Sequence, residues 1–331
     1  MPLKDAYGRL HNYLRVSVTD RCNLRCRYCM GPEGVKNIPH EQILSYEEIL
    51  QVIRAGARLG ISRIRITGGE PLVRKNVVSL VEQTAQVPGI EDLSMTTNGL
   101  LLKKYAPDLK KAGLMRVNIS IDSLKPEVYR YITRCGDLAT VMAGLEAALE
   151  LGLEPVKINT VLMKGINDGE VPAFLELART WPVHVRFIEF MPIGIADRYS
   201  REYYLPLSFV LETAAAAGLE LKPAAPPQGA GPAETYALPG GRGTVGLIHP
   251  ISRHFCAGCN RLRLTADGHL KACLYWQEER SVRPALGNPE ALEALLEEVV
   301  REKPHHHGMT AAAQSGDFDR GEMRSMNKTG G

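Results

Sequence analysis

Residues 13–29 decide the fold, and they read Tyr13-Leu14-Arg15-Val16-Ser17-Val18-Thr19-Asp20-Arg21-Cys22-Asn23-Leu24-Arg25-Cys26-Arg27-Tyr28-Cys29. The first seven residues alternate between aliphatic and polar side chains, which predicts a strand with one apolar and one polar face. The strand runs into a loop that carries three cysteines in the spacing Cys-x3-Cys-x2-Cys. In parallel barrels the chemistry lies at the carboxyl ends of the strands, so we expect this loop to belong to a reactive site.

The same alternation returns along the chain, and each segment is followed by a helix-like stretch. The six predicted strands are 13–19, 61–67, 92–97, 115–122, 155–163 and 183–190. A capping box at Ser45-Tyr46-Glu47-Glu48 predicts the start of the first connecting helix. Alternating strands and helices predict parallel strands with right-handed crossovers. The predicted fold class is therefore α/β, an incomplete parallel (β/α)6 barrel of the TIM type, with a smaller C-terminal α+β extension that closes the barrel.

Polar side chains occupy one face of each of the first five predicted strands. A standard barrel fills its interior with branched apolar residues, so polar inner faces predict a solvated or ligand-filled cavity. An antiparallel sheet with one wet face would show the same alternation, but the intervening helices argue against it. Arg15, Arg65 and Lys157 lie on these inner faces. Because buried cations need an anion, we expect a ligand that carries phosphate.

Six of the seven cysteines fall into two triads, Cys22, Cys26, Cys29 and Cys256, Cys259, Cys273. Two odd-numbered clusters cannot pair off internally as disulfides, and metal binding is the better interpretation in a chain without an export signal. Zinc sites and iron–sulfur clusters usually take four protein ligands. Three cysteines leave one metal position open, which indicates a reactive site. Cys135 is interpreted as a small residue near a helix end.

The composition is that of a folded globular protein, with 44% hydrophobic residues and 40 Lys and Arg against 37 Asp and Glu. A net charge of +3 is too small to predict a nucleic-acid partner. The chain has neither an apolar run of membrane-spanning length nor the apolar core of a signal peptide, so we expect a cytoplasmic protein without a membrane partner.

The second triad belongs to a separate C-terminal region. Proline and glycine become frequent between Lys222 and Pro232, which predicts a boundary between a barrel core at 1–222 and a second region at 223–331. Within the second region, 262–265 and 269–274 predict a hairpin that returns Cys273 to the other two cysteines of its triad. A helix is predicted over 289–302. The run His305-His306-His307 is interpreted as a solvated loop without an assigned role.

Together with Gly68-Gly69-Glu70-Pro71, the first cysteine motif resembles that of the radical S-adenosylmethionine enzymes. The second triad and the terminal Gly330-Gly331 narrow the resemblance, over about residues 10–331, to the GTP 3′,8-cyclase family of molybdenum cofactor biosynthesis. Further matching motifs lie at 17–22, 65–71, 96–99 and 186–191.

The resemblance implies two [4Fe–4S] clusters, one on each triad, and S-adenosylmethionine at the open iron of the first. The implied contacts of S-adenosylmethionine are Tyr28, Gly69, Ser120 and Met191. The implied GTP contacts are Arg15, Arg65, Thr96, Lys157, Arg261 and Arg263. The second cluster would bind the guanine base. Arg261, Arg263 and the tail residues Gly330 and Gly331, which would reach into the active site, are the implied catalytic residues.

The implied reaction is reductive cleavage of S-adenosylmethionine to a 5′-deoxyadenosyl radical, which abstracts the 3′ hydrogen of GTP and leads to 3′,8-cyclo-7,8-dihydro-GTP. The implied partners are a flavodoxin- or ferredoxin-like electron donor, a cyclic pyranopterin monophosphate synthase that takes the product, and a second copy in a homodimer. One alternative is a peptide-modifying radical enzyme with an auxiliary cluster, although a peptide would leave the inner cations without their anion. The other is a zinc-stabilised binding protein, which would be colourless where an iron–sulfur protein is brown.

Overall fold

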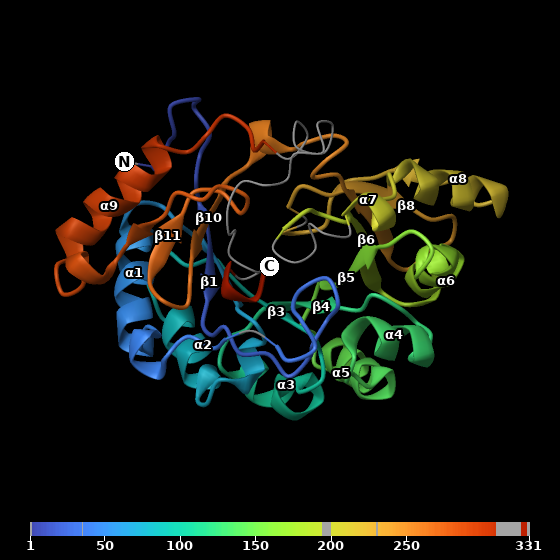
Figure 1. Ribbon diagram of the computed structural model, residues 1–331, viewed down its shortest axis with the longest axis horizontal. Coiled ribbons are helices and arrows are strands. Elements are labelled where there is room, and N and C mark those ends of the chain that lie inside the picture. The colour runs from blue at the N-terminus through green and yellow to red at the C-terminus, as the bar shows by residue number, and fades with distance from the viewer. Residues whose placement is uncertain (1, 35, 194–199, 230, 309–325, 330–331) are drawn as a thin grey trace.

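All six predicted strands form, and they lie side by side in a parallel array. The computed structural model describes residues 2–34, 36–193, 200–229, 231–308 and 326–329 (Figure 1). The strands are β1 (Tyr13–Ser17), β2 (Arg63–Thr67), β3 (Asp92–Thr97), β4 (Arg116–Ser120), β5 (Val156–Leu162) and β6 (Val183–Glu189). Each pairs in parallel with the next. The predicted partial barrel of β/α units is confirmed.

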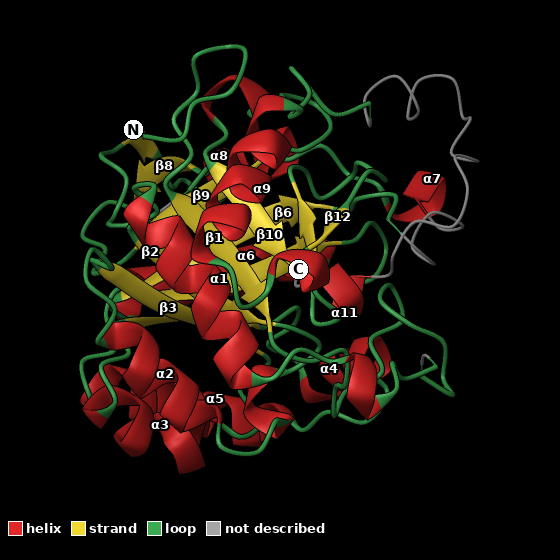
Figure 2. Cartoon of the chain, turned by 90° about the vertical axis from the view of Figure 1, so that its left-hand side faces the viewer, coloured by secondary structure: helices red, strands yellow, loops and turns green. Residues whose placement is uncertain are grey.

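The connecting helices form an arc around the outside of the strands (Figures 1 and 2). They are α1 (Tyr46–Arg58), α2 (Val77–Ala85), α3 (Leu102–Lys111), α4 (Pro126–Thr133), α5 (Leu138–Glu150), α6 (Val171–Thr180) and α8 (Ser208–Ala216), with α9 (Pro289–Arg301) from the C-terminal region. The predicted capping box starts α1. The Ser45 hydroxyl accepts the Glu48 N–H at 3.2 Å, and the Glu48 carboxylate accepts the Ser45 N–H at 2.7 Å.

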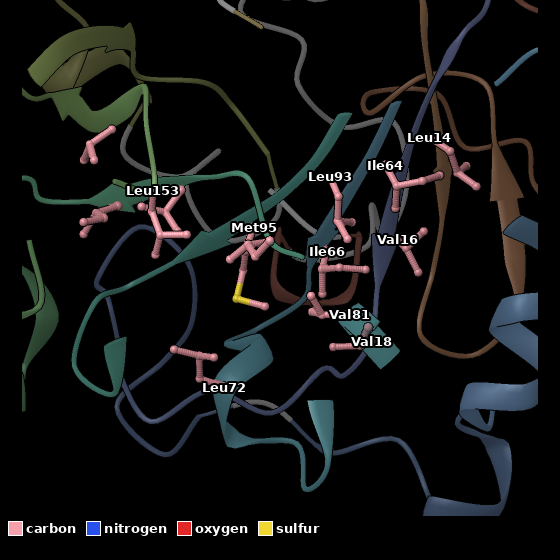
Figure 3. Packing of buried hydrophobic residues seen from close by; sticks show 14 of the residues in the cluster. Leu14, Val16, Val18, Ile64, Ile66, Leu72, Val81, Leu93, Met95 and Leu153 are labelled. Carbon is pink, nitrogen blue, oxygen red and sulfur yellow. The ribbon is translucent and has the colours of Figure 1, made fainter. Parts of the chain in front are cut away.

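The aliphatic faces of the strands pack against this arc of helices. Leu14, Val16 and Val18 of the first strand and Ile64 and Ile66 of β2 are completely buried (Figure 3). Each such side chain contributes about 1.5–3 kcal/mol when fully buried. Because successive side chains of a strand point to opposite faces, this packing turns the polar residues of the same strands inward.

The C-terminal region extends the sheet at both edges. β10 (Arg261–Leu264) pairs in parallel with β1, and β9 (Thr244–Ile248) pairs in parallel with β6. Antiparallel strands continue the two edges, namely β11 (His269–Lys271) and β12 (Arg280–Ser281) on one side, β8 (Glu234–Ala237) and β7 (Lys222–Pro223) on the other. The predicted hairpin is confirmed as β10 and β11.

The described sheet runs continuously across the predicted boundary at 222/223, which falls within β7. The division into two domains therefore stays a prediction. Among the described residues, every helix is too short or too polar to cross a bilayer.

Candidate active site

The topology places the two cysteine triads at opposite ends of the barrel lumen. Strands β1 and β10 are parallel, with Tyr13 opposite Arg261. The first triad follows β1, whereas Cys256 and Cys259 precede β10, so the two loops lie at opposite ends of the strand pair. The turn between β10 and β11 brings Cys273 back to Cys256, close enough for the two thiols to interact electrostatically.

A cavity of about 270 Å³ lies between the two ends. Most of the residues predicted to bind cluster, cofactor or substrate line it: Cys22, Cys26, Cys29, Tyr28, Gly69, Ser120, Met191, Arg15, Arg65, Thr96, Arg261 and Arg263. Lys157 and the cysteines of the second triad lie outside this lining. Gly330 and Gly331 are outside the described residues.

At the first-triad end, the Gly68-Gly69 turn packs directly on the cysteine loop. The Gly69 N–H donates to the Thr19 carbonyl at 2.7 Å, and the Glu70 N–H donates to the Arg21 carbonyl at 2.8 Å. A Cβ atom on Gly69 would lie 2.3 Å from the Arg21 carbonyl oxygen, so no larger residue fits. The motif thus sets the position of the loop that carries Cys22.

The Glu70 side chain connects the Gly68-Gly69 turn to the end of β3 and the residue after it through hydrogen bonds. Its buried carboxylate accepts the Leu72 N–H at 3.0 Å, the Thr97 hydroxyl at 2.8 Å and the Asn98 N–H at 2.7 Å. Burial raises the pKa of Glu70 to about 7. With its carboxylate engaged in this way, the acceptor that the motif offers to an ammonium ligand is a backbone carbonyl.

Tyr28 stands beside the first triad and is held by a carboxylate. Its hydroxyl donates to Asp122 at 2.7 Å, and its ring packs edge-on against Phe190 with 6.4 Å between centroids. Burial raises the pKa of Asp122 to about 6. An aromatic face fixed at the cavity wall suits a flat heteroaromatic ligand.

Arginines form a row across the lumen toward the other end. Arg15 lies between Arg263 of β10 and Arg65 of β2 in the strand register. Burial, and then the charge of Arg263, lower the pKa of Arg15 well below its usual value. Arg186 adds a further guanidinium, which donates to the amide oxygens of Asn118 at 2.9 Å and Asn159 at 2.6 Å. The described lining contains five arginines, including Arg186 and Arg261, against the single carboxylate of Asp122.

Three hydroxyl groups in this lining, those of Tyr13, Thr96 and Tyr129, lack protein partners within the described chain. All three are buried. Polar atoms in such positions are usually satisfied by a ligand or water. Sequence reasoning included Thr96 but missed Tyr13 and Arg186. Tyr13 lies two residues before Arg15 on the same strand, so the alternation that places Arg15 on the inner face also places Tyr13 there.

The Pro- and Gly-rich stretch at the predicted boundary enters the lumen rather than only linking two regions. The Gln228 carbonyl accepts a hydrogen bond from the fully buried Lys157, and Gly229, Gly231 and Pro232 line the cavity. Lys157 therefore lies behind this loop. Burial and the charges of Arg116 and Arg186 lower the pKa of Lys157 to about 6.

At the second-triad end, cations surround the cysteines. Burial raises the pKa of Cys259, but Arg261 and Lys303 outweigh it and lower this pKa to about 6. Arg9 donates 2.8 Å hydrogen bonds to the carbonyls of Cys256 and His305, which ties the histidine run to the triad. His305 and His306 are exposed, as a solvated loop would be, whereas His307 is buried.

The end of the described chain also reaches the cavity. Met326 is the first residue of the short helix α11 (Met326–Thr329; Figure 2). It lines the cavity and packs in one apolar cluster with Ile193 and Tyr275. The Thr329 side chain is buried, and its hydroxyl donates to the Met326 carbonyl at 3.3 Å.

Both triads fit a cluster with an open iron. Within the described residues no three His, Cys, Asp or Glu side chains converge as ligands of a single ion. The thiols of each triad interact electrostatically, which suits ligands of separate irons in one cluster. The Gly69 turn and the Tyr28 ring form a cradle beside the first triad.

Comparisons with known proteins identify the families that this chain resembles. Residues 16–178 match the radical SAM superfamily, and residues 183–309 match the family described as Molybdenum Cofactor Synthesis C. A GTP 3′,8-cyclase of Listeria monocytogenes is 47% identical over 330 residues, which cover 99% of both chains. A GTP 3′,8-cyclase of Moorella thermoacetica is 51% identical over 310 residues, or 93% of this chain and 95% of the relative.

A solved structure shares the fold at low sequence identity. Streptococcus suis SuiB bound to S-adenosylmethionine superposes with a TM-score of 0.56 and 14% identity, covering 93% of this chain and 69% of SuiB.

Proposed function

This chain belongs to the GTP 3′,8-cyclases of molybdenum cofactor biosynthesis, within the radical S-adenosylmethionine superfamily, and from that premise we propose how its residues divide the work. The first triad holds a [4Fe–4S] cluster that, with S-adenosylmethionine bound, supplies the radical chemistry. We assign a second [4Fe–4S] cluster to Cys256, Cys259 and Cys273. In this proposal S-adenosylmethionine binds at the first-triad end of the lumen, and GTP binds toward the second-triad end.

The first-triad end binds S-adenosylmethionine. The backbone at Gly69 accepts from its amino group, Tyr28 packs on its adenine, and Ser120 and Met191 complete the pocket. Glu70 and Asp122 hold these contacts in place through the hydrogen bonds described above.

The arginine row binds the triphosphate of GTP. Arg15, Arg65 and Arg263 present their charges side by side, and bidentate guanidinium contacts suit phosphate oxygens. Arg261, Thr96 and Lys157 belong to the same site, with Lys157 reaching it once the loop at Gln228 moves. Arg261 also keeps the guanine end next to the second triad, and Gly330 and Gly331 complete the catalytic set.

One observation carries this assignment, namely the excess of four positive charges among the described lining residues, five arginines less one aspartate. Such a cavity is costly unless a polyanion fills it. A peptide substrate would bring no polyphosphate to match this excess of positive charge. The flavodoxin- or ferredoxin-like donor, the downstream cyclic pyranopterin monophosphate synthase, the homodimer and the cytoplasmic location stay predictions.

Anaerobic reconstitution with iron and sulfide tests the proposal. The reduced protein is incubated with S-adenosylmethionine and GTP, and 5′-deoxyadenosine and cyclised nucleotide are quantified by mass spectrometry. We expect both products to appear in step, from protein that holds two clusters.

The matched variants are Cys259→Ser and Cys135→Ser. The first should still cleave S-adenosylmethionine but fail to cyclise GTP, whereas the second, outside both triads, should behave as the parent. Normal cyclisation by Cys259→Ser would remove the second cluster from the mechanism. Cleavage without any GTP turnover by the parent would mean that the substrate is wrong.

A further inference from the structure

A buried lysine touches the second triad, and neither the sequence motifs nor the function assigned above uses it. Lys303 follows the C-terminus of α9, and only 4% of its surface is exposed. Its ammonium donates to the carbonyls of Arg261 at 2.6 Å and Ala272 at 2.8 Å. These carbonyls belong to residues two positions after Cys259 and one position before Cys273. Lys303 therefore bridges the two chain segments that carry the triad.

The third acceptor of this side chain is the sulfur of Cys259. An ammonium group has three N–H donors and a neutral amine has two, so three acceptors match the charged form. This geometry places a full positive charge in hydrogen-bond contact with a cluster ligand.

The anion that balances Lys303 is the triad itself. The Asp5 carboxylate, on the N-terminal segment beside the triad, is already held by Arg9 at 2.5 Å and His11 at 3.0 Å. The strongest charges acting on Lys303 are those of Cys259, Cys273 and Arg261. A buried cation is stable only with a partner of opposite charge, and thiolates supply it here.

We propose that Lys303 is a positioning residue of the second triad, which fixes Cys259 and raises the reduction potential of the cluster bound there. The inference rests on the second cluster assigned under the proposed function. A hydrogen bond to a cysteine sulfur and a nearby positive charge both stabilise the reduced cluster, which carries one more electron. The balance differs at the first triad, where burial and the charge of Glu70 outweigh the charge of Arg25 and raise the pKa of Cys22, and where burial and the charge of Asp122 raise the pKa of Cys26.

The test isolates the second cluster in the full chain. Cys22→Ser, Cys26→Ser and Cys29→Ser together leave only the second triad to hold iron, and this parent is titrated anaerobically while the reduced cluster is followed by electron paramagnetic resonance. Lys303→Met, which keeps the length of the side chain without its charge, is compared with Lys303→Arg, which keeps the charge. We expect Lys303→Met to shift the midpoint potential to a more negative value and Lys303→Arg to shift it less.

The possible outcomes distinguish failure of the role proposed for Lys303 from failure of the second cluster itself. Equal midpoint potentials for the parent and Lys303→Met would overturn the role of Lys303 and leave the second cluster intact. A parent that binds no iron would overturn the second cluster itself. If Lys303→Met loses iron, Lys303→Gln, which keeps a donor without charge, takes its place, and an unchanged potential in that variant overturns the inference equally.

Discussion

The two cysteine triads of this chain lie in opposite electrostatic surroundings. Burial, with the charge of Glu70 added to it, raises the pKa of Cys22 to about 11. At the other end, Arg261 and Lys303 outweigh burial and lower the pKa of Cys259 to about 6. Added to burial, the charges of Glu70 and Asp122 thus raise the pKa of Cys22 and Cys26 at one end, whereas those of Arg261 and Lys303 lower the pKa of Cys259 at the other.

The difference matches the charges of the two ligands. S-adenosylmethionine brings a sulfonium, an ammonium and a carboxylate group, with a net positive charge, so the end proposed to receive it needs hydrogen-bond acceptors and few competing cations. GTP brings a triphosphate, so the end that receives it needs the arginine row. A lumen open to both ligands from both ends would let each occupy the other's place. Under the proposed function, the electrostatic asymmetry disfavours this exchange.

The largest expected effect comes from a substitution that disrupts the first cysteine loop, compared with a matched substitution in the second cysteine loop. Gly69→Ala places a methyl group 2.3 Å from the Arg21 carbonyl oxygen, so the first cysteine loop must move. Gly258→Ala, in the second cysteine loop, meets no atom within 4 Å. We expect Gly69→Ala to lose the first cluster and essentially all product, and Gly258→Ala to stay within about twofold of the parent. Iron content and product yield measure both. Equal tolerance of the two substitutions would contradict the close packing at Gly69.

The next effect separates substrate from cofactor. Arg263→Ala removes one guanidinium group from the arginine row, and losing a hydrogen bond to a charged group costs about 1.5–3 kcal/mol, or about 10- to 150-fold in GTP affinity. S-adenosylmethionine binding and both clusters should persist. Arg280→Ala is the control, because that exposed arginine pairs with Glu302 on the surface. Unchanged GTP affinity in Arg263→Ala would remove this arginine from the site.

Much of this arrangement could be predicted from the sequence. Period-two alternation located all six core strands and assigned Arg15 and Arg65 to the inner face, because burial of one face fixes the direction of the other. The spacing of the cysteines and the Asp267-Gly268 turn located both triads. These signals are local, and each is contained in fewer than about twenty residues.

The features that could not be predicted depend on distant contacts. Lys303 reaches the second triad only because α9 packs beside the extended sheet, and nothing near it in sequence marks it. The segment around Gln228 is rich in proline and glycine, a composition that linkers and cavity-lining loops share. The sequence alone therefore could not show that this segment lines the cavity. Arg186 is held by asparagines from two other strands. Tertiary packing decides all three.

A smaller effect on GTP binding is expected from removing a single tyrosine hydroxyl, and one tyrosine near each end of the cavity allows the comparison. Tyr13 and Tyr129 both line the cavity with buried hydroxyls that make no hydrogen bond within the described residues. Tyr13 lies in the arginine row, whereas Tyr129 lies near Cys26. A neutral hydrogen bond contributes about 0.5–1.5 kcal/mol, so Tyr13→Phe should weaken GTP binding by about 2- to 13-fold and leave S-adenosylmethionine binding unchanged. Tyr129→Phe should leave GTP binding unchanged. Calorimetry on the reconstituted protein checks both, and equal GTP affinities for Tyr13→Phe and the parent would exclude a contact with the substrate.

The last prediction concerns the stability of the folded chain and measures what burial of Lys157 costs when no ligand is bound. The pKa of Lys157 is about 6 in the folded chain and 10.5 ordinarily, so between these values the unfolded chain binds more protons. Folding stability therefore rises with pH across this window, and Lys157 lowers it most at and below about pH 6. Lys157→Met removes this pH-dependent loss of folding stability. The variant should therefore unfold at a higher temperature than the parent near pH 7, and the difference should decrease toward pH 10. One kcal/mol corresponds to about 2–4 °C in a domain of 150–250 residues, and a longer chain shifts less. The exposed Lys110→Met is the control. A difference independent of pH would mean that the lysine does not titrate in this window, whereas a difference that decreases would show that burial, together with the charges of Arg116 and Arg186, makes the charged form of Lys157 costly in the folded chain.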